Sequence, residues 1–167
     1  GGALTMRFRR YSSDAFELCD IHPLFAELLA ELPRAAARHD SARARLYPDP
    51  IGSEVAEAIG EDLEDWREHV HPELERLFAG SREKVSEDLG ALGAKTGSVR
   101  CVIPRDNIDA WLNALNQARL VIVEENNFGE RELSGAEPPD LSTRRGLALL
   151  KVHFYAHLQE LLVEAAG

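Results

Sequence analysis

The chain has 167 residues and a formal net charge of −10, with 44% apolar and 29% charged residues. This length and composition favour one domain over 1–167 with its own core, with residues 1–3 disordered or not native to it. The negative charge argues against nucleic-acid binding as the main activity, because affinity for phosphates comes from clustered Lys and Arg. No apolar run approaches the roughly 18 residues of a membrane span, and Cys19 and Cys101 form no Cys-x-x-Cys pair, which favours a cytoplasmic protein without membrane contact.

The first part of the chain predicts one strand and then helices. Alternating apolar and polar residues indicate a short strand over 4–10, and the apolar spacing becomes helical over 13–32. Pro33 is expected to end or bend this helix, because a proline inside a helix removes a hydrogen bond. Another helix is expected over 35–46, and the two prolines of 47–50 predict a turn.

The middle of the chain predicts two further helices and a second strand. A helix is expected over 53–70 with Trp66 on its apolar stripe, and Pro72 is expected to break or kink it. The helical pattern resumes over 74–92. A short strand is expected over 98–103, where it could pair with the first strand.

The last part of the chain predicts two long helices joined by an exposed loop. Asp106 is expected to cap the first helix, which should end near Asn127. Turn-forming and charged residues over 129–140 indicate the loop. Asp140 or Ser142 is expected to cap the final helix, whose apolar stripe consists of Leu147, Leu150, Phe154, Leu158 and Leu161.

The elements together predict a mainly α fold. We expect about five or six helices, packed as an orthogonal or irregular bundle, with a minor two-stranded β-ribbon. Because a lone ribbon is marginally stable, it should pack on the helices.

Three stretches carry a family resemblance, namely 45–49, 111–120 and 158–163, which read RLYPD, WLNALNQARL and LQELLV. In this order they resemble an uncharacterised bacterial family, a domain of unknown function that is common in actinobacteria and often encoded beside the adaptor of the Clp protease. The resemblance implies a short Arg-Phe strand, matched by Arg7-Phe8, and no known activity. The sequence departs from the family at His157, where an aromatic residue is usual.

Asn116 and Arg119 are candidate binding residues, together with Trp111 on the same predicted helix. The two polar residues are three positions apart, so both side chains can share one helix face. A guanidinium group beside an amide could bind a carboxylate or phosphate. The alternative, which we favour, is an internal salt bridge of Arg119 that anchors the loop or the ribbon, because buried charges usually pair within a protein.

His153, His157 and Glu160 are the candidate metal ligands. Their spacing places them along one face of the final helix, which suits a metal ion. No Glu directly follows the first His, so the pattern supplies no general base of the zincin type. We therefore favour a solvated polar face over a metal site and expect no cofactor.

Arginines form two basic groups in this acidic chain. They could attract an acidic partner or nucleic acid, or cover apolar surface and pair with local acids. The groups are Arg7, Arg9 and Arg10 on the first predicted strand, and Arg34, Arg38 and Arg45 on the predicted helices.

The sequence favours a non-catalytic interaction or regulatory domain, because no nucleophile motif or phosphate-binding loop is present. Enzyme activity is left undecided but is not favoured. The candidate partners are a second copy of the chain, bound through one of its last two long helices, and a protein of the Clp protease pathway, which the resemblance suggests. The alternatives are a metal-binding protein or metal-dependent enzyme that uses the histidines of the final helix, and a weak nucleic-acid binder.

Overall fold

The computed structural model describes residues 4–46, 71–90, 92 and 99–167. This part of the chain is mainly helical with a small antiparallel sheet, which confirms the predicted fold class at that level. The predicted turn and helix over 47–70, with Trp66, lie outside the described residues. The helices are α1 (Pro23–Leu46), α4 (His71–Leu89), α5 (Ile108–Asn126), α6 (Glu130–Leu133) and α7 (Arg144–Ala166), and a 3-10 turn covers Arg105–Asn107.

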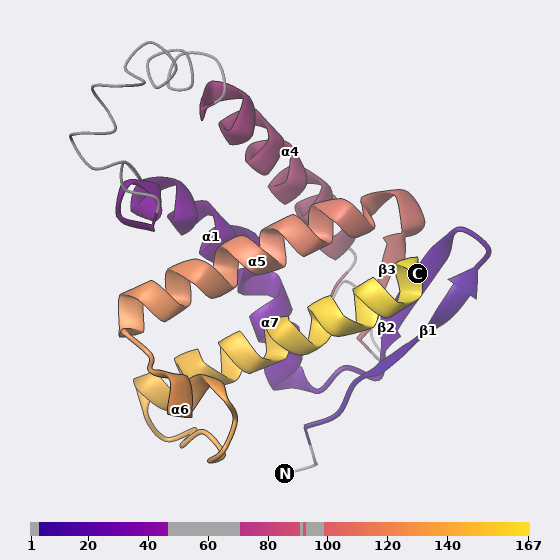
Figure 1. Cartoon of the computed structure of the whole chain (residues 1–167). Coiled ribbons are helices and arrows are strands. Elements are labelled where there is room, and N and C mark those ends of the chain that lie inside the picture. The colour runs from indigo at the N-terminus through magenta and orange to yellow at the C-terminus, as the bar shows by residue number, and fades with distance from the viewer. Residues whose placement is uncertain (1–3, 47–70, 91, 93–98) are drawn as a thin grey trace.

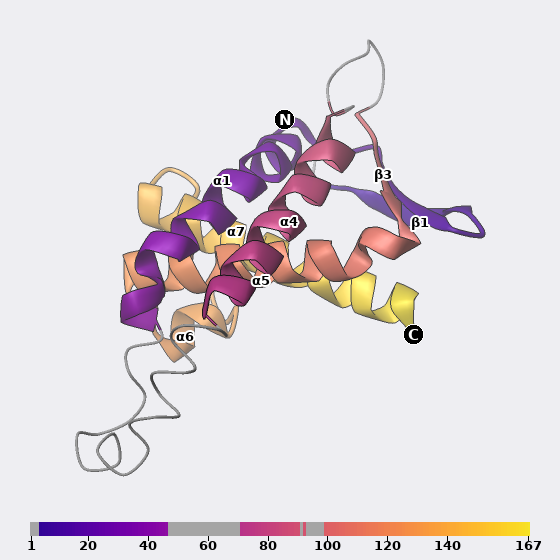
Figure 2. The same ribbon diagram turned by 90° about the horizontal axis from the view of Figure 1, so that it is seen from above.

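Helix α5 is the centre of the fold. Helices α1, α4 and α7 all pack against it, and the sheet lies at the end of the molecule where α7 ends (Figures 1 and 2). A helix covered on three sides must be apolar over most of its circumference, and the α5 sequence meets this requirement. Its buried apolar residues are Ile108, Ala110, Trp111, Ala114, Leu115, Ala118, Val121 and Ile122. None of the helices in the described ranges combines the length and apolar character needed to cross a membrane.

Helix α1 continues through Pro33, so of the two expected effects of this proline, an end or a bend, the end is wrong. The helix expected over 35–46 is the second half of α1. Leu29, Leu32 and Ala36 are fully buried on either side of the proline. Their packing against α5 compensates for the hydrogen bond that proline cannot donate.

The sheet has three strands rather than the predicted two. They are β1 (Arg7–Ser12), β2 (Ala15–Cys19) and β3 (Cys101–Pro104), in the order β1-β2-β3 and all antiparallel. The helix expected from Ser13 is therefore wrong over β2. The predicted pairing of the two terminal strands is also wrong, because β2 lies between them.

The register gives the sheet a core face and an outer face. Residues directly opposite each other on paired strands share a face. Phe8, Phe16 and Leu18 therefore point toward the helices, where Leu18 is fully buried. Arg9 of β1 and Glu17 of β2 lie on the outer face.

Two of the predicted helix caps differ from the structure. Residue Asp106 lies in the 3-10 turn, and α5 begins after Asn107, whose side chain accepts no capping hydrogen bond. Thr143 caps α7 by accepting a hydrogen bond from the Gly146 backbone N–H at 2.9 Å, so neither Asp140 nor Ser142 is the cap. The predicted end of α5 is confirmed, because the C-cap residue Asn127 has a left-handed φ of 51°.

The segment 129–140 is exposed for most of its length, as predicted, but it also contains the one-turn helix α6. Gly146 packs closely beneath this segment at the first turn of α7. A β-carbon at this position would overlap the backbone carbonyl of Asp140.

We expect Gly146→Ala to lower the free energy of unfolding by about 2 kcal/mol or more, because the methyl group meets backbone rather than a flexible side chain. Gly80→Ala is the matched control. Gly80 also lies in a helix, but nothing approaches its position within 4 Å, so this change should stabilise the protein by up to about 1 kcal/mol. Urea denaturation of both variants measures the difference, and equal effects would contradict the close packing at Gly146.

Candidate functional site

Trp111 is a core residue in the structure. Its side chain is 0% exposed, and its indole N–H donates to the Asp88 carboxylate at 2.8 Å. Asn107 donates to both oxygens of the same carboxylate, at 3.2 and 3.0 Å. These contacts tie the end of α4 to the start of α5. Trp111 therefore has a structural role in this conformation and presents no surface to a ligand.

Arg119 is tied to α7 rather than to Asn116. Its Nη1 atom donates to Oε1 of Gln159 at 2.5 Å, and Gln159 donates in turn to the Leu112 carbonyl at 3.4 Å. The Arg119 Nε atom is buried and has no hydrogen-bond partner among the described residues. Asn116 is exposed. The structure thus supplies an internal partner for Arg119, but this partner is a neutral amide on α7 and not a carboxylate of the loop or the ribbon.

His153, His157 and Glu160 do not converge on a common point. His153 is half-buried beneath the loop at Gly135, whereas His157 and Glu160 are exposed. Within the described ranges, no three side chains of His, Cys, Asp or Glu come together in a way that could hold a metal ion. His157 and Glu160 are thus exposed as a solvated polar face requires, whereas the Nε2 atom of His153 is buried and has no hydrogen-bond partner among the described residues.

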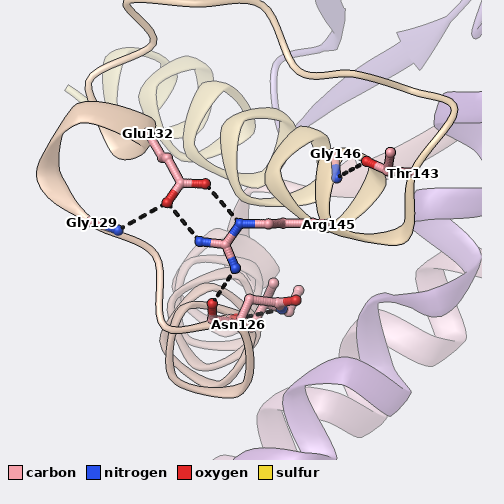
Figure 3. A network of polar contacts seen from close by, with 7 residues as sticks. Asn126, Gly129, Glu132, Thr143, Arg145 and Gly146 are labelled. Atoms are coloured by element: carbon pink, nitrogen blue, oxygen red, sulfur yellow. Dashed lines mark hydrogen bonds and ion pairs between the residues drawn. The ribbon is translucent and has the colours of Figure 1, made fainter.

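A surface pocket of about 260 Å³ lies between the loop and the start of α7. Arg145 is one of the residues that line it, and this side chain is already bound to neighbouring groups (Figure 3). It forms two hydrogen bonds to Glu132 at 3.0 and 2.6 Å, donates to the Asn126 carbonyl at 2.6 Å, and lies 4.7 Å from the ring centre of Phe128. The arginine therefore holds the loop on α7 and offers no free charge to a ligand.

The outer face of the sheet contains the second candidate site, a buried carboxylate between two arginines. Glu17 of β2 is 1% exposed. Arg9 of β1 lies 3.1 Å from its Oε1 atom and Arg100 lies 3.0 Å from its Oε2 atom. Tyr11 is 55% exposed, and its ring lies beneath the Arg100 guanidinium at 5.4 Å.

Further arginines extend this basic region to both ends of the sheet. Arg7 pairs with the exposed Asp20 at 3.1 Å, and Arg105 lies over the Phe16 ring at 5.1 Å. The Arg10 side chain is exposed and forms no ion pair or hydrogen bond with any described residue. We refer to these five arginines as the arginine surface. Arg7, Arg9 and Arg100 lie on the outer face of the sheet, whereas Arg10, which is opposite Phe16, and Arg105, which lies over the Phe16 ring, are on the side of the core face.

The three arginines of β1, which are Arg7, Arg9 and Arg10, lie on an open sheet edge. Of the described residues, only β2 pairs with β1, so the other side of β1 has no neighbouring strand. Helix α4 contacts the opposite edge at β3. The sequence singled out Arg7, Arg9 and Arg10 as a basic group but missed Glu17, because residues 15–19 were assigned to a helix.

Comparison with known proteins identifies a family without a known activity. The model of the family described as Domain of unknown function (DUF2017) matches residues 7–166. No curated protein and no solved structure matches the chain.

The two arginines around Glu17 provide a test of the outer face. We expect Arg9→Gln and Arg100→Gln each to cost about 1 kcal/mol of stability, because the remaining arginine still neutralises the buried carboxylate. The double variant should lose about 3 kcal/mol or more, because the charge is then buried without a partner. Urea denaturation of the three variants measures this double-mutant cycle. If the loss in the double variant equalled the sum of the two single losses, the proposed burial of an unpaired charge would be contradicted. Arg7→Gln is the control, with an expected loss of about 0.5 kcal/mol or less, because its ion pair is exposed.

The Arg145 contact provides a test of the loop. The pKa of Glu132 lies below its ordinary value of 4.5, mainly because Arg145 donates hydrogen bonds to its carboxylate. The contact should therefore stabilise the loop above pH 4.5 and be lost as the pH falls through the lower pKa of the folded protein. NMR titration should show that the Glu132 pKa rises toward its ordinary value in Arg145→Gln. It should stay unchanged in Arg131→Gln, which breaks only the ion pair with Glu137. An unaltered Glu132 pKa in Arg145→Gln would rule out this cause.

Proposed function

The chain belongs to the DUF2017 family, and from this starting point we propose that it is a non-catalytic interaction domain that binds an acidic protein partner through the arginine surface. One observation carries the proposal. In a protein with a net charge of −10, five arginines and an exposed tyrosine gather around a three-stranded sheet whose outer strand has an open edge. Exposed arginine and tyrosine are enriched at protein interfaces.

The charge distribution favours a protein over a nucleic acid as the partner. Residues 4–20 and 99–105 carry five arginines but also three acidic residues, Asp14, Glu17 and Asp20. Two of these acids already pair with Arg7, Arg9 and Arg100. Phosphate binding needs arginines that are free to replace counterions, and it is opposed by the overall negative charge. A protein segment with a few carboxylates requires fewer free charges.

The two cysteines support a domain without cysteine chemistry in a reducing compartment, which we take to be the cytoplasm. Both are free and buried. Burial raises the pKa of the Cys19 thiol and raises that of Cys101 to about 12. Because the thiolate is the nucleophile, neither side chain is suited to nucleophilic catalysis at neutral pH.

We interpret the helices as an irregular bundle around α5. This bundle is the scaffold that supports the sheet. Because α1, α4 and α7 cover the apolar face of α5, and the buried apolar residues of α7, such as Phe154 and Leu158, are likewise covered within one chain, neither helix favours a homodimer. The remaining candidate is a heterologous protein partner, and the family resemblance makes a component of the Clp protease pathway the first to test.

Site-specific photo-crosslinking in cells tests the proposal. We expect a photoreactive amino acid at Tyr11 to form covalent adducts with a protein, because this side chain is 55% exposed at the arginine surface. The same amino acid at Leu141 is the matched control. Leu141 is 40% exposed and precedes α7, whereas the sheet lies beside the other end of that helix (Figure 1). Adducts are detected by immunoblotting and identified by mass spectrometry.

The proposal requires that adducts at position 11 clearly exceed those at position 141 and resist nuclease treatment. Adducts that nuclease removes would instead indicate a nucleic-acid partner. An adduct made only of two copies of the chain would indicate self-association. Either result, or no adduct at position 11, would overturn the proposal.

A further inference from the structure

We propose that the partner is bound as an extended acidic segment that pairs with the open edge of β1 and becomes a fourth strand of the sheet. This inference rests on the proposed function and specifies how the partner is recognised. It combines three features of the structure: the unpaired backbone of β1, the alternation of side chains along it, and its positive charge.

The backbone of β1 is suited to strand addition. Successive residues of an edge strand direct their N–H and C=O groups alternately toward and away from the neighbouring strand. Half of these groups in Arg7–Ser12 therefore face away from β2 and pair with no described residue. Strand β2 pairs with β1 along one side and with β3 along the other, so β1 lies on a sheet that is already formed. An added strand would satisfy the outward-facing groups.

The side chains of β1 specify an alternating pattern in the added strand. Arg7 and Arg9 point to the outer face, where their side chains are 65% and 54% exposed. Phe8 points to the core face, where it is half-buried and stacks on Phe16 with ring centres 5.6 Å apart. Residues next to each other on paired strands share a face. Acidic residues in the added strand would thus lie beside Arg7 and Arg9, and apolar residues would extend the core face beside Phe8 and the aliphatic stem of Arg10, which shares that face.

A second copy of the chain is a poor occupant of this edge. Pairing of β1 with β1 would place Arg7, Arg9 and Arg10 of one copy next to the same residues of the other. Like charges directly opposite each other on paired strands are destabilising. The same positive charge attracts a strand that carries carboxylates, so charge complementarity favours an acidic segment of another protein.

Binding of synthetic peptides tests the pairing directly. The probe is a dye-labelled, end-blocked peptide of about eight residues in which Glu and Val alternate, a length typical of a strand. A peptide with the same composition in two blocks, all Glu and then all Val, keeps the charge but loses the alternation. Two further peptides carry N-methyl groups on the Glu residues or on the Val residues, so each loses the amide donors of one edge only. Fluorescence anisotropy with the full chain measures each affinity.

Strand addition predicts an asymmetric result with the methylated peptides. The alternating peptide should bind at least about tenfold more tightly than the block peptide, and one N-methylated form should bind as well as the parent. The other methylated form should bind at least about tenfold more weakly, because its donors face β1. Equal affinities of both methylated forms, or of the alternating and block peptides, would overturn strand addition.

Variants of the chain locate the binding site. The variant Arg7→Glu reverses one exposed charge on the outer face and leaves the Glu17 pairs intact, and it should weaken the binding of the alternating peptide about threefold or more. Arg144→Glu is the matched control, because it reverses one exposed arginine in the first turn of α7, and it should leave the affinity unchanged. Equal affinity of Arg7→Glu and the parent protein would exclude this edge as the site.

The two experiments fail separately. If position 11 forms protein adducts in cells but the peptides show no dependence on alternation or methylation, the interaction domain stands and strand addition is wrong. If the peptides bind as expected but no adduct forms at position 11, the edge is competent for strand addition and the proposed function in the cell is wrong.

Discussion

The fold depends on the burial of α5 on three sides. Polar groups on a buried helix need partners inside the protein, because water cannot reach them. The indole of Trp111 finds one in Asp88 of α4, and the guanidinium of Arg119 finds one in Gln159 of α7. These hydrogen bonds fix the two outer helices relative to α5. The sheet depends on the same arrangement, because β3 leads into α5 through a 3-10 turn of only three residues.

The sequence predicts the helices better than the sheet, for a physical reason. An amphipathic helix repeats its apolar residues locally, so α5 and its end at Asn127 can be recognised from nearby residues alone. Strand β2 is buried on both faces, so it lacks the alternation that marks a strand, and its Phe16, Leu18 and Cys19 resemble a helical run. Pro33 predicts an end or a bend of the helix because the loss of a hydrogen bond at proline is visible in the local sequence, whereas the packing against α5 that compensates for it is not.

The candidate site was only partly predictable for the same reason. The arginines of β1 are visible in the sequence, and they were identified as a basic group. Whether these arginines form a binding surface depends on their ion pairs with Glu17 and on the order of the strands. Both result from contacts between segments that are far apart in the chain. Arg100 reaches Glu17 from more than eighty residues away along the chain. The partner of Arg119 lies 40 residues away, so no local pattern could distinguish an amide on α7 from an acid in the loop.

The buried carboxylate explains how one strand can carry several arginines and remain ordered. An unpaired group of arginines on a small sheet would repel one another, and long side chains lose conformational entropy when they are fixed. Glu17 offsets the repulsion and orients Arg9 and Arg100, so part of this entropy is already lost before any partner binds. Positive charge along an open edge also opposes pairing between copies, which protects the fold from aggregation. The positive charge that opposes pairing between two copies of this edge would therefore also favour pairing with an acidic strand.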